Sequence, residues 1–311
     1  DSKTASQWLL ALCQAAKSFA DKLKTVKGIC ISGNGPTIVA QDGTTLLWNA
    51  DISACEAETS KIAGKLAEKA TKSAAQKNTT KSLFIPRLAA FRQMYSSQWK
   101  NSDYVFSGPE YLMYLLTGQA VTVLPEQRFE AAYWNSEELL RMGFSPAEQK
   151  KFPSFVAPAF NLGKTTEKIT AQLGLPQQVP VFCGAPDFVA ALIGTNTLTP
   201  GKICDRAGSS EGINLCTDKI LKNPKIRMLP SVMPGLWNAS VLIPNSGKLF
   251  SEYKQKTEKV RKKSLSYEAL VEECLSAKSG EGFAIMQDLA EKTKCAIEIL
   301  QKALDSAVSD G

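Results

Sequence analysis

The amino-acid sequence predicts a mixed α/β protein with two domains. Its 311 residues exceed the usual length of one domain, and 44% of them are apolar while 22% are charged, as in ordinary globular proteins. Short apolar runs between glycine and proline alternate with longer runs of helical periodicity. No apolar run approaches the roughly 20 residues that span a bilayer, and no signal-peptide pattern opens the sequence. We therefore expect a cytoplasmic protein without a membrane partner.

The sequence contains no histidine, which limits the chemistry that the chain can perform. A Ser-His or Cys-His mechanism is excluded, and a general base must be a carboxylate, a lysine, a tyrosine or a thiolate. The eight cysteines form no CxxC motif. Because Cys30 and Cys183 have apolar neighbours, we expect unpaired thiols that pack in the core, as in a reducing cytosol, rather than disulfides or metal ligands.

The formal net charge of +7 raises the question of nucleic-acid binding. The lysines are spread over alanine-rich stretches, and the basic run at 259–263 has no aromatic residues interleaved for base stacking. We therefore expect solvated helix faces and no nucleic-acid partner.

Apolar spacing and turn residues place the elements of the first half. Apolar residues at helical intervals from Trp8 predict a helix, and Asp42-Gly43 predicts the turn of a hairpin. Pro109 and Gly118 are expected to bound a helix, and Ser145-Pro-Ala-Glu148 forms a capping box. The expected elements are a helix at 8–23, a strand at 26–31, a hairpin at 37–48, and helices at 56–82, 109–118, 145–152 and 165–174.

The second half alternates short strands with turns and helices. Asp187 is expected where a strand meets the start of the next helix, and turns are expected at 208–211 and 245–248. The expected elements are strands at 179–184, 202–207, 212–216 and 239–243, and helices at 188–193 and 283–308.

Two features of this half could carry chemistry. At a helix start, Asp187 could simply cap backbone amides, or its carboxylate could lie at the mouth of a cleft and accept a hydroxyl proton during phosphoryl transfer. Gly208-Ser209-Ser210 could be a plain hairpin turn, or its amides and hydroxyls could hold a phosphate. The same two alternatives apply to Ser246-Gly247 and to Gly33-Asn34-Gly35.

The order of these features resembles that of the FGGY carbohydrate kinases, which include glycerol kinase, xylulokinase, ribulokinase and gluconate kinase. The segment from Pro109 to Gly118 is similar to the family's DYLxYxLTG motif. The segment from Gly184 to Gly194 resembles GxxDxxAAxxG, and Gly208-Ser209-Ser210 is similar to the GTS phosphate turn. Ile31 to Gly35 resembles IxxSGQ, and Ser246-Gly247 is similar to a later glycine near the nucleotide.

The resemblance implies a fold of two ribonuclease-H-like (actin-like) domains around a cleft, with ATP and Mg²⁺ as cofactors. It also implies that Asp187 is the catalytic base. The residues that it places beside the nucleotide phosphates are Gly208, Ser209, Ser210 and Gly247. The residues that it places on the sugar side are Asn34, Gly35, Asp51 and Phe188.

The sequence departs from the family pattern at several positions. No counterpart of the family's opening DxGTT hairpin precedes Asp1, and no counterpart of its late adenosine-binding GG segment follows Gly282. The family's WxDxR becomes Trp48-Asn-Ala-Asp51-Ile-Ser53, without the arginine, and Pro36 stands near the place of a frequent histidine. We therefore expect the two-domain kinase fold to be incomplete here.

The sequence thus leads to one main hypothesis and one alternative. We expect a partial sugar-binding domain at 1–178 and a partial nucleotide-binding domain at 179–311. The main hypothesis is ATP-dependent phosphorylation of a hydroxyl of a small sugar or polyol. The alternative is a non-catalytic sugar-binding or scaffold protein on a degenerate kinase fold. The identity of the sugar and a homodimeric state are left open.

Overall fold

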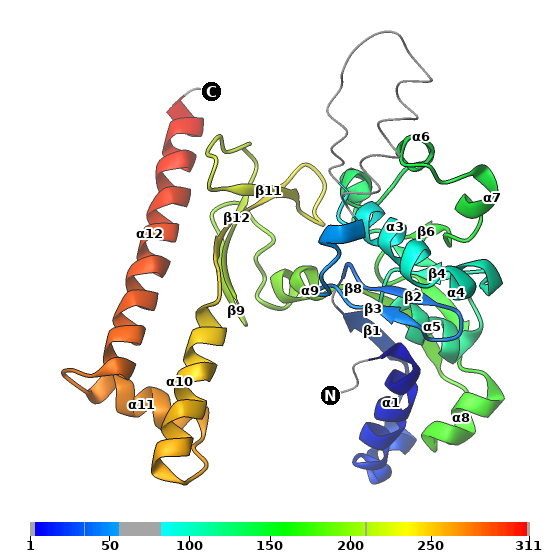
Figure 1. Ribbon diagram of the computed structural model, residues 1–311, viewed down its shortest axis with the longest axis horizontal. Coiled ribbons are helices and arrows are strands. Elements are labelled where there is room, and N and C mark those ends of the chain that lie inside the picture. Colours follow the sequence, from blue (N-terminus) through cyan, green and yellow to red (C-terminus); the bar gives the residue numbers. More distant parts are fainter. Residues whose placement is uncertain (1–3, 34, 56–81, 209, 310–311) are drawn as a thin grey trace. The chain divides into compact units, whose positions relative to one another are not determined.

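The computed structural model describes residues 4–33, 35–55, 82–208 and 210–309 (Figure 1). Contacts between residues divide the chain into two compact units, Asp1–Ala190 and Ala191–Gly311. Asn34, Ser209 and nearly all of the helix expected at 56–82 lie outside the described residues.

The first unit extends further along the chain than the boundary that the sequence suggests between residues 178 and 179. Strand β8 (Pro180–Pro186) pairs in parallel with β1 (Ile29–Gly33) and antiparallel with β7 (Asn161–Lys164). Because both partners belong to the first unit, β8 is held there, and α9 (Asp187–Gly194) runs across the division between the units. Residue patterns alone do not reveal such pairing between distant segments.

Three small sheets and the helices around them make up the described part of the first unit, with strand orders β1-β8-β7, β3-β2-β4 and β5-β6. The remaining strands are β2 (Ile38–Ala40), β3 (Thr45–Leu46), β4 (Val105–Phe106), β5 (Thr122–Val123) and β6 (Phe155–Val156). The helices are α1 (Trp8–Lys17), α3 (Ile85–Met94), α4 (Ser96–Asn101), α5 (Glu110–Thr117), α6 (Ser136–Arg141), α7 (Pro146–Gln149) and α8 (Glu167–Leu173). Short 3-10 helices lie at Ala5–Gln7, Ala20–Thr25 and Gln127–Ala132.

Local sequence signals account for several of these element ends. Gly118 ends α5 in the left-handed conformation, with φ 76°, and Ser145 forms the expected capping box at α7. Gly174 ends α8 in the same way as Gly118. The helix expected at 8–23 is shorter than predicted, because α1 ends at Lys17 and the 3-10 turn at Ala20–Thr25 follows it.

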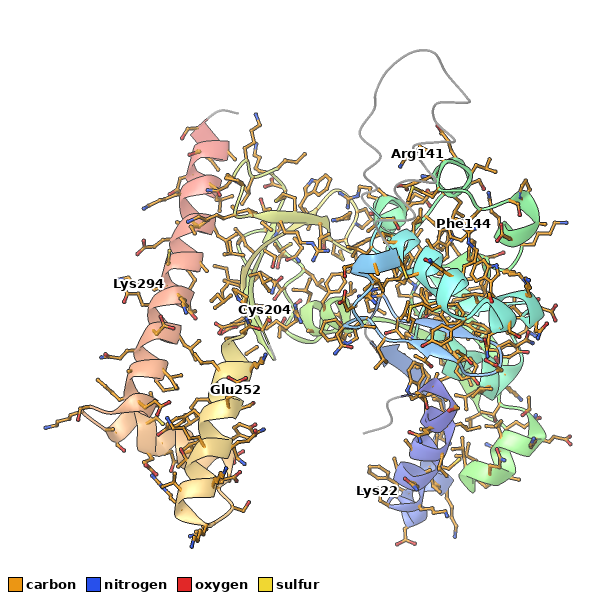
Figure 2. The ribbon with its side chains drawn as sticks, in the orientation of Figure 1. Lys22, Arg141, Phe144, Cys204, Glu252 and Lys294 are labelled. Atoms are coloured by element: carbon orange, nitrogen blue, oxygen red, sulfur yellow. The ribbon has the colours of Figure 1, made fainter. Side chains whose placement is uncertain are left out.

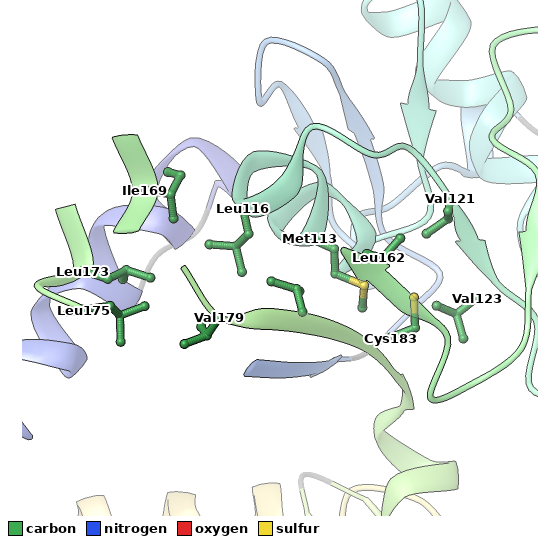
Figure 3. Close-up of a cluster of buried hydrophobic side chains, with 11 residues drawn as sticks. Met113, Leu116, Val121, Val123, Leu162, Ile169, Leu173, Leu175, Val179 and Cys183 are labelled. Carbon is green, nitrogen blue, oxygen red and sulfur yellow. The ribbon is translucent and has the colours of Figure 1, made fainter. Parts of the chain in front are cut away.

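The core of the first unit surrounds β8, as Figure 3 shows. Val181 and Cys183 of β8 are fully buried with Met113 and Leu116 of α5. Burial raises the pKa of the Cys183 thiol to about 12, so this cysteine behaves as an apolar core residue. Cys30, which we expected in the core as well, is exposed, because the side chains of β1 alternate and its neighbours Ile29 and Ile31 face the core.

The second unit is an antiparallel sheet with helices, and its strands follow the order β11-β12-β10-β9. The strands are β9 (Ile203–Ala207), β10 (Glu211–Thr217), β11 (Arg227–Pro230) and β12 (Trp237–Ile243). The helices are α10 (Ser246–Arg261), α11 (Tyr267–Ser276) and α12 (Glu281–Ser309). The strands β9, β10 and β12 and the helix α12 confirm the expected elements, whereas β11, α10 and α11 were not expected.

Helix α12 covers one face of this sheet. Ile213 and Val241 of the sheet pack against Ala296 and Leu300 of the helix, while Lys294 points away from the sheet on the opposite side of α12 (Figure 2). This apolar contact positions β9, β10 and β12, whose ends carry the predicted phosphate residues. No helix in the described part of the chain combines the length and the apolar composition that crossing a membrane requires.

Candidate functional site

The carboxyl ends of β1 and β8 form one edge of the first sheet. The two strands are parallel, with Ile31 opposite Cys183 and Gly33 opposite Pro186. Because parallel strands end at the same edge of a sheet, the chain leaves β1 next to the point where Asp187 begins α9. This edge therefore brings together two segments that the sequence singled out as candidate site segments.

Close backbone contact fixes this edge. Gly184 approaches β1 so closely that a Cβ atom on it would lie 2.2 Å from the carbonyl oxygen of Ile31. The hydroxyl of Ser32 donates a hydrogen bond to the carbonyl oxygen of Ala185. The glycine in the GxxD segment thus permits the packing that positions Asp187.

Asp187 is exposed at the start of α9. Its Oδ1 accepts a hydrogen bond from the backbone amide of Phe188 at 2.7 Å, so part of its role is to satisfy an amide at the helix start. It makes no ion pair with a described residue. An exposed carboxylate of this kind can also accept a hydrogen bond from a bound hydroxyl.

The other candidates on the sugar side lie in different surroundings. Phe188 is half-buried, and its ring centroid lies 6.1 Å from that of Phe129. Gly35 is exposed, and a Cβ atom on it would lie 3.3 Å from the ring of Phe84. Phe188 is next to Asp187 in the sequence. Gly35 comes near Asp187 only because β1, which precedes Gly35, pairs with β8, which precedes Asp187.

Asp51 has a local structural role. The amide of Ser53 donates to its Oδ1 at 2.9 Å, and this hydrogen bond lowers the pKa of the exposed carboxyl. The preceding segment is held by Arg87 of α3, whose guanidinium donates to the carbonyl oxygens of Leu47 at 2.7 Å and Ala50 at 3.2 Å. No described contact joins Asp51 to Asp187. Arg87 was not among the predicted site residues.

In the second unit, Gly208 and Ser210 lie in the turn of the β9–β10 hairpin. Ala207 pairs with Glu211, and the amide of Gly208 donates to the carbonyl oxygen of Ser210 at 3.0 Å. Gly208 and Ser210 therefore have the backbone of a hairpin, which both alternatives from the sequence share. The hydroxyl oxygen of Ser210 reaches further, because it accepts a hydrogen bond from the amide of Asn245 at 3.2 Å.

The segment 245–248, expected to be a turn, is instead the start of helix α10. Asn245 adopts the left-handed conformation, with φ 60°, and the helix begins at Ser246. Asn-Ser-Gly is typical of turns, but here the left-handed residue directs the chain from β12 into a helix of 16 residues. Gly247 therefore lies in the first turn of α10.

The start of α10 offers unpaired hydrogen-bond donors. The Asn245 side chain does not cap the helix, and the first intrahelical bond joins the amide of Leu249 to the carbonyl oxygen of Asn245 at 2.9 Å. The amides of Ser246, Gly247 and Lys248 have no partner in the described part of the chain. The Ser246 hydroxyl also has none, although the residue is only 4% exposed. Such a helix start binds anions well.

A pocket of about 540 Å³ joins this helix start to the β9–β10 turn. It contains both glycines that the sequence singled out for phosphate binding. Its lining residues are Ala207, Gly208, Gly247, Lys248, Phe250, Ser251 and Tyr267. The ammonium group of Lys248 lies 3.9 Å from the carboxylate of Glu252, and both side chains are more than half exposed. The pocket therefore combines free amides with a cation that is only weakly neutralised.

Residues 2–194, more than half of the chain, match the family model for the N-terminal domain of the FGGY family of carbohydrate kinases. The chain belongs to the FGGY family. The match includes the β1–β8 edge and the whole of α9, so the family assignment covers Asp187. The pocket in the second unit lies outside the matched residues.

Solved structures share the FGGY fold over most of this chain. A xyloylose kinase from Brucella ovis is 18% identical, with a TM-score of 0.64 over 94% of this chain and 68% of its own. A xylulose kinase from Rhodospirillum rubrum is 17% identical, with a TM-score of 0.60 over 89% and 59%. Plasmodium falciparum glycerol kinase with ADP is 10% identical, with a TM-score of 0.58 over 88% and 57%. The chain therefore has an incomplete form of this two-domain fold.

The family resemblance implies two cofactors, ATP and Mg²⁺, and the described residues can be compared with the needs of each. The free amides at the start of α10 and Lys248 suit the phosphates of a nucleotide. No group of three or more cysteine, aspartate or glutamate residues in the described segments could hold a metal ion.

Sequence reasoning singled out Ser246-Gly247 but missed Lys248 as the cation and Tyr267 as part of the pocket wall. A strand followed by a glycine and then by a long lysine-rich segment could have indicated the helix start at 246. Nothing in the local pattern indicates that Tyr267, from the next helix, returns to the same pocket.

Proposed function

We propose that this FGGY chain takes part in transferring the γ-phosphoryl group of ATP to a hydroxyl of a small sugar or polyol. The observation that carries the proposal is the position of Asp187, exposed at the start of α9 on the edge where β1 and β8 end. Membership in a family of carbohydrate kinases supports this reaction class.

In the proposed reaction, Asp187 is the base. Its carboxylate accepts the proton of the acceptor hydroxyl, the hydroxyl oxygen bonds to the γ-phosphorus, and the bond from that phosphorus to the bridging oxygen breaks, which releases ADP. Its main contribution is to orient the hydroxyl toward the phosphorus. Its hydrogen bond from the Phe188 amide holds the carboxylate in place.

On the nucleotide side, we assign Gly208, Ser209, Ser210 and Gly247 to the phosphates. The free amides at the start of α10 and the Lys248 ammonium group support this assignment, because both attract phosphate oxygens. ATP is proposed to arrive with Mg²⁺, which is usually held by substrate phosphates and water as well as by protein carboxylates.

On the sugar side, we assign Asn34, Gly35, Asp51 and Phe188. The division into a sugar-binding part at 1–178 and a nucleotide-binding part at 179–311 stays part of the proposal, although β8 and the start of α9, with Phe188, belong to the first compact unit. We also propose a cytoplasmic location, since unpaired thiols such as Cys183 persist in a reducing compartment. A homodimer is compatible with the proposal.

A second candidate is a sugar-binding or scaffold protein without catalysis. Ser53 stands where the family motif has an arginine. One carboxylate oxygen of Asp51 already accepts a hydrogen bond from the Ser53 amide. Both changes lie on the proposed sugar side, where the acceptor hydroxyl must be oriented for transfer to occur.

A ligand panel separates the two candidates. The melting temperature of the chain is measured with ATP·Mg²⁺ alone, with pentoses, hexonates and polyols alone, and with both, and ADP release is followed in the same mixtures. A kinase is expected to be stabilised by the nucleotide and by one sugar, each by RT ln(1 + [L]/Kd), and to release ADP only when that sugar is present. Stabilisation by a sugar alone, without any effect of ATP, would instead favour the non-catalytic candidate.

A further inference from the structure

The pocket at the start of α10 has an aromatic wall contributed by α11. Tyr267, the first residue of α11, lines it together with Phe250 of α10. Tyr267 is 49% exposed, whereas Phe250 is only 9% exposed. Because Gly208 and Gly247 line the same pocket, a single ligand can contact backbone amides and an aromatic ring at once.

Helix α10 holds the ring of Tyr267 in position. The Tyr267 hydroxyl lies 3.1 Å from the hydroxyl of Ser251, and the ammonium group of Lys254 lies 5.1 Å from the ring centroid. The ring of Phe250 lies 6.2 Å away at an interplanar angle of 33°. A ring that is already held by three neighbours loses little conformational freedom when a ligand packs on it.

The connection between α10 and α11 is also fixed. Glu258 Oε1 accepts a hydrogen bond from the amide of Leu265 at 2.8 Å and pairs with the Lys254 ammonium group at 2.7 Å. Arg261 of α10 donates to Glu273 of α11 at 2.7 Å. The start of α11 therefore keeps its place relative to α10, and Tyr267 keeps its place in the pocket.

We propose that Tyr267 is the residue on which the base of a nucleoside triphosphate packs, while the free amides of α10 bind the phosphates. The volume of about 540 Å³ lies within the range of roughly 300–1,000 Å³ that is common for small-molecule sites. Every base has a π-face that stacks on an aromatic ring, and phosphates favour a helix start. This inference rests on the proposed function, because it concerns the same nucleotide.

Two ligands that share their phosphates test the proposal on the full chain. Dissociation constants for ATP and for inorganic triphosphate are measured by calorimetry for the wild type, Tyr267→Ala and Tyr267→Phe. We expect Tyr267→Ala to weaken ATP binding about tenfold and to leave triphosphate binding unchanged. Tyr267→Phe keeps the ring and is expected to bind both ligands as the wild type does.

Controls keep the result interpretable. Leu275→Ala removes an exposed side chain from α11 outside the pocket, and it should change neither affinity. If Tyr267→Ala lowers the melting temperature, Tyr267→Leu, which retains bulk without an aromatic face, replaces it in the same comparison.

Three results would overturn the proposal. If Tyr267→Ala bound ATP as tightly as the wild type, the base would not pack on Tyr267, and the proposed function would be unaffected. Equal weakening of ATP and triphosphate would make Tyr267 a structural residue. Failure of the wild type to bind either ligand would overturn both this placement and the proposed function.

Discussion

The α-carbon of Gly184 faces the carbonyl oxygen of Ile31 so closely that a Cβ atom would lie 2.2 Å from that oxygen. The two residues belong to the parallel strands β8 and β1. Because Asp187 lies three residues after Gly184, directly after the end of β8, this contact determines where the carboxylate lies relative to the segment that leaves β1. The candidate site thus depends on a glycine that contributes no functional group.

Replacing this glycine tests that dependence. Gly184→Ala must push β1 and β8 apart, and we expect a loss of about 1–3 kcal/mol in the free energy of unfolding, as for other overpacked sites. The measurement is urea denaturation. Gly194→Ala is the matched control, because a Cβ atom there meets nothing within 4 Å. If Gly184→Ala had the same urea midpoint as the wild type, β1 and β8 would accommodate the added Cβ atom without a loss of stability.

Much of the fold could be predicted where one segment determines its own structure. Gly118 ends α5, Ser145 caps α7, and Asp187 begins α9, each by a local backbone preference or a nearby hydrogen bond. The motif containing Asp187 also led to the FGGY family, which the family match confirms.

The remainder depends on contacts between distant segments. The pairing of Gly33 with Pro186 joins strands that are far apart in the sequence, and no local pattern contains that register. Asn245 shows a second reason why the sequence did not predict the structure. The left-handed conformation that Asn favours occurs both in turns and directly before a helix such as α10. The roles of Asn34 and Ser209 stay predictions, since both lie outside the described residues.

The role of Asp187 can be separated from its role at the helix start. Asp187→Asn keeps an oxygen that can accept the hydrogen bond from the Phe188 amide. The new carboxamide cannot take up the proton of the acceptor hydroxyl. We expect kcat to fall by about 10²–10⁴-fold while the sugar still raises the melting temperature. Steady-state kinetics with the sugar found in the ligand panel provide the measurement.

A surface carboxylate provides the control for this substitution. Asp103→Asn makes the same chemical change at an exposed residue of the first unit, and its kcat should equal that of the wild type. If Asp187→Asn retained full turnover while Asp187→Ala lost stability, Asp187 would be a helix cap and not a base.

Glu110 of α5 makes stability depend on pH. The residue is 4% exposed, its Oε1 accepts a hydrogen bond from the Val123 amide at 3.0 Å, and its Oε2 has no described partner. Burial raises the pKa of Glu110 above its ordinary value of 4.5. The folded protein therefore holds this proton more tightly than the unfolded chain, so that stability falls as pH rises above 4.5 toward the raised pKa.

Glu110→Gln removes the titrating group and keeps an acceptor for Val123. The free energy of unfolding of wild type and variant is compared between about pH 4 and pH 8, where one group changes it by at most about 1.4 kcal/mol per pH unit. We expect the difference between variant and wild type to grow in favour of the variant as pH rises. A difference that stays constant with pH would show that Glu110 ionises normally in the folded protein.

Lys248 tests whether the start of α10 attracts phosphate. Lys248 lines the pocket, its ammonium group lies 3.9 Å from the carboxylate of Glu252, and its side chain is 65% exposed. Because solvent screens such a charge, its attraction for a phosphate is about 1 kcal/mol, which corresponds to roughly a fivefold change in affinity. We expect Lys248→Met to weaken the binding of inorganic triphosphate by this factor and to reduce its dependence on salt.

The matched control places the same charge change at the other end of the helix. Lys259 lies in the last turn of α10 and is exposed, so Lys259→Met alters the net charge equally but leaves the pocket intact. Calorimetry at two salt concentrations on both variants separates a local contact from a general electrostatic effect. If both substitutions weakened triphosphate binding equally, triphosphate would be attracted by the net charge of the chain. Lys248 would then not act together with the α10 amides in the proposed phosphate site.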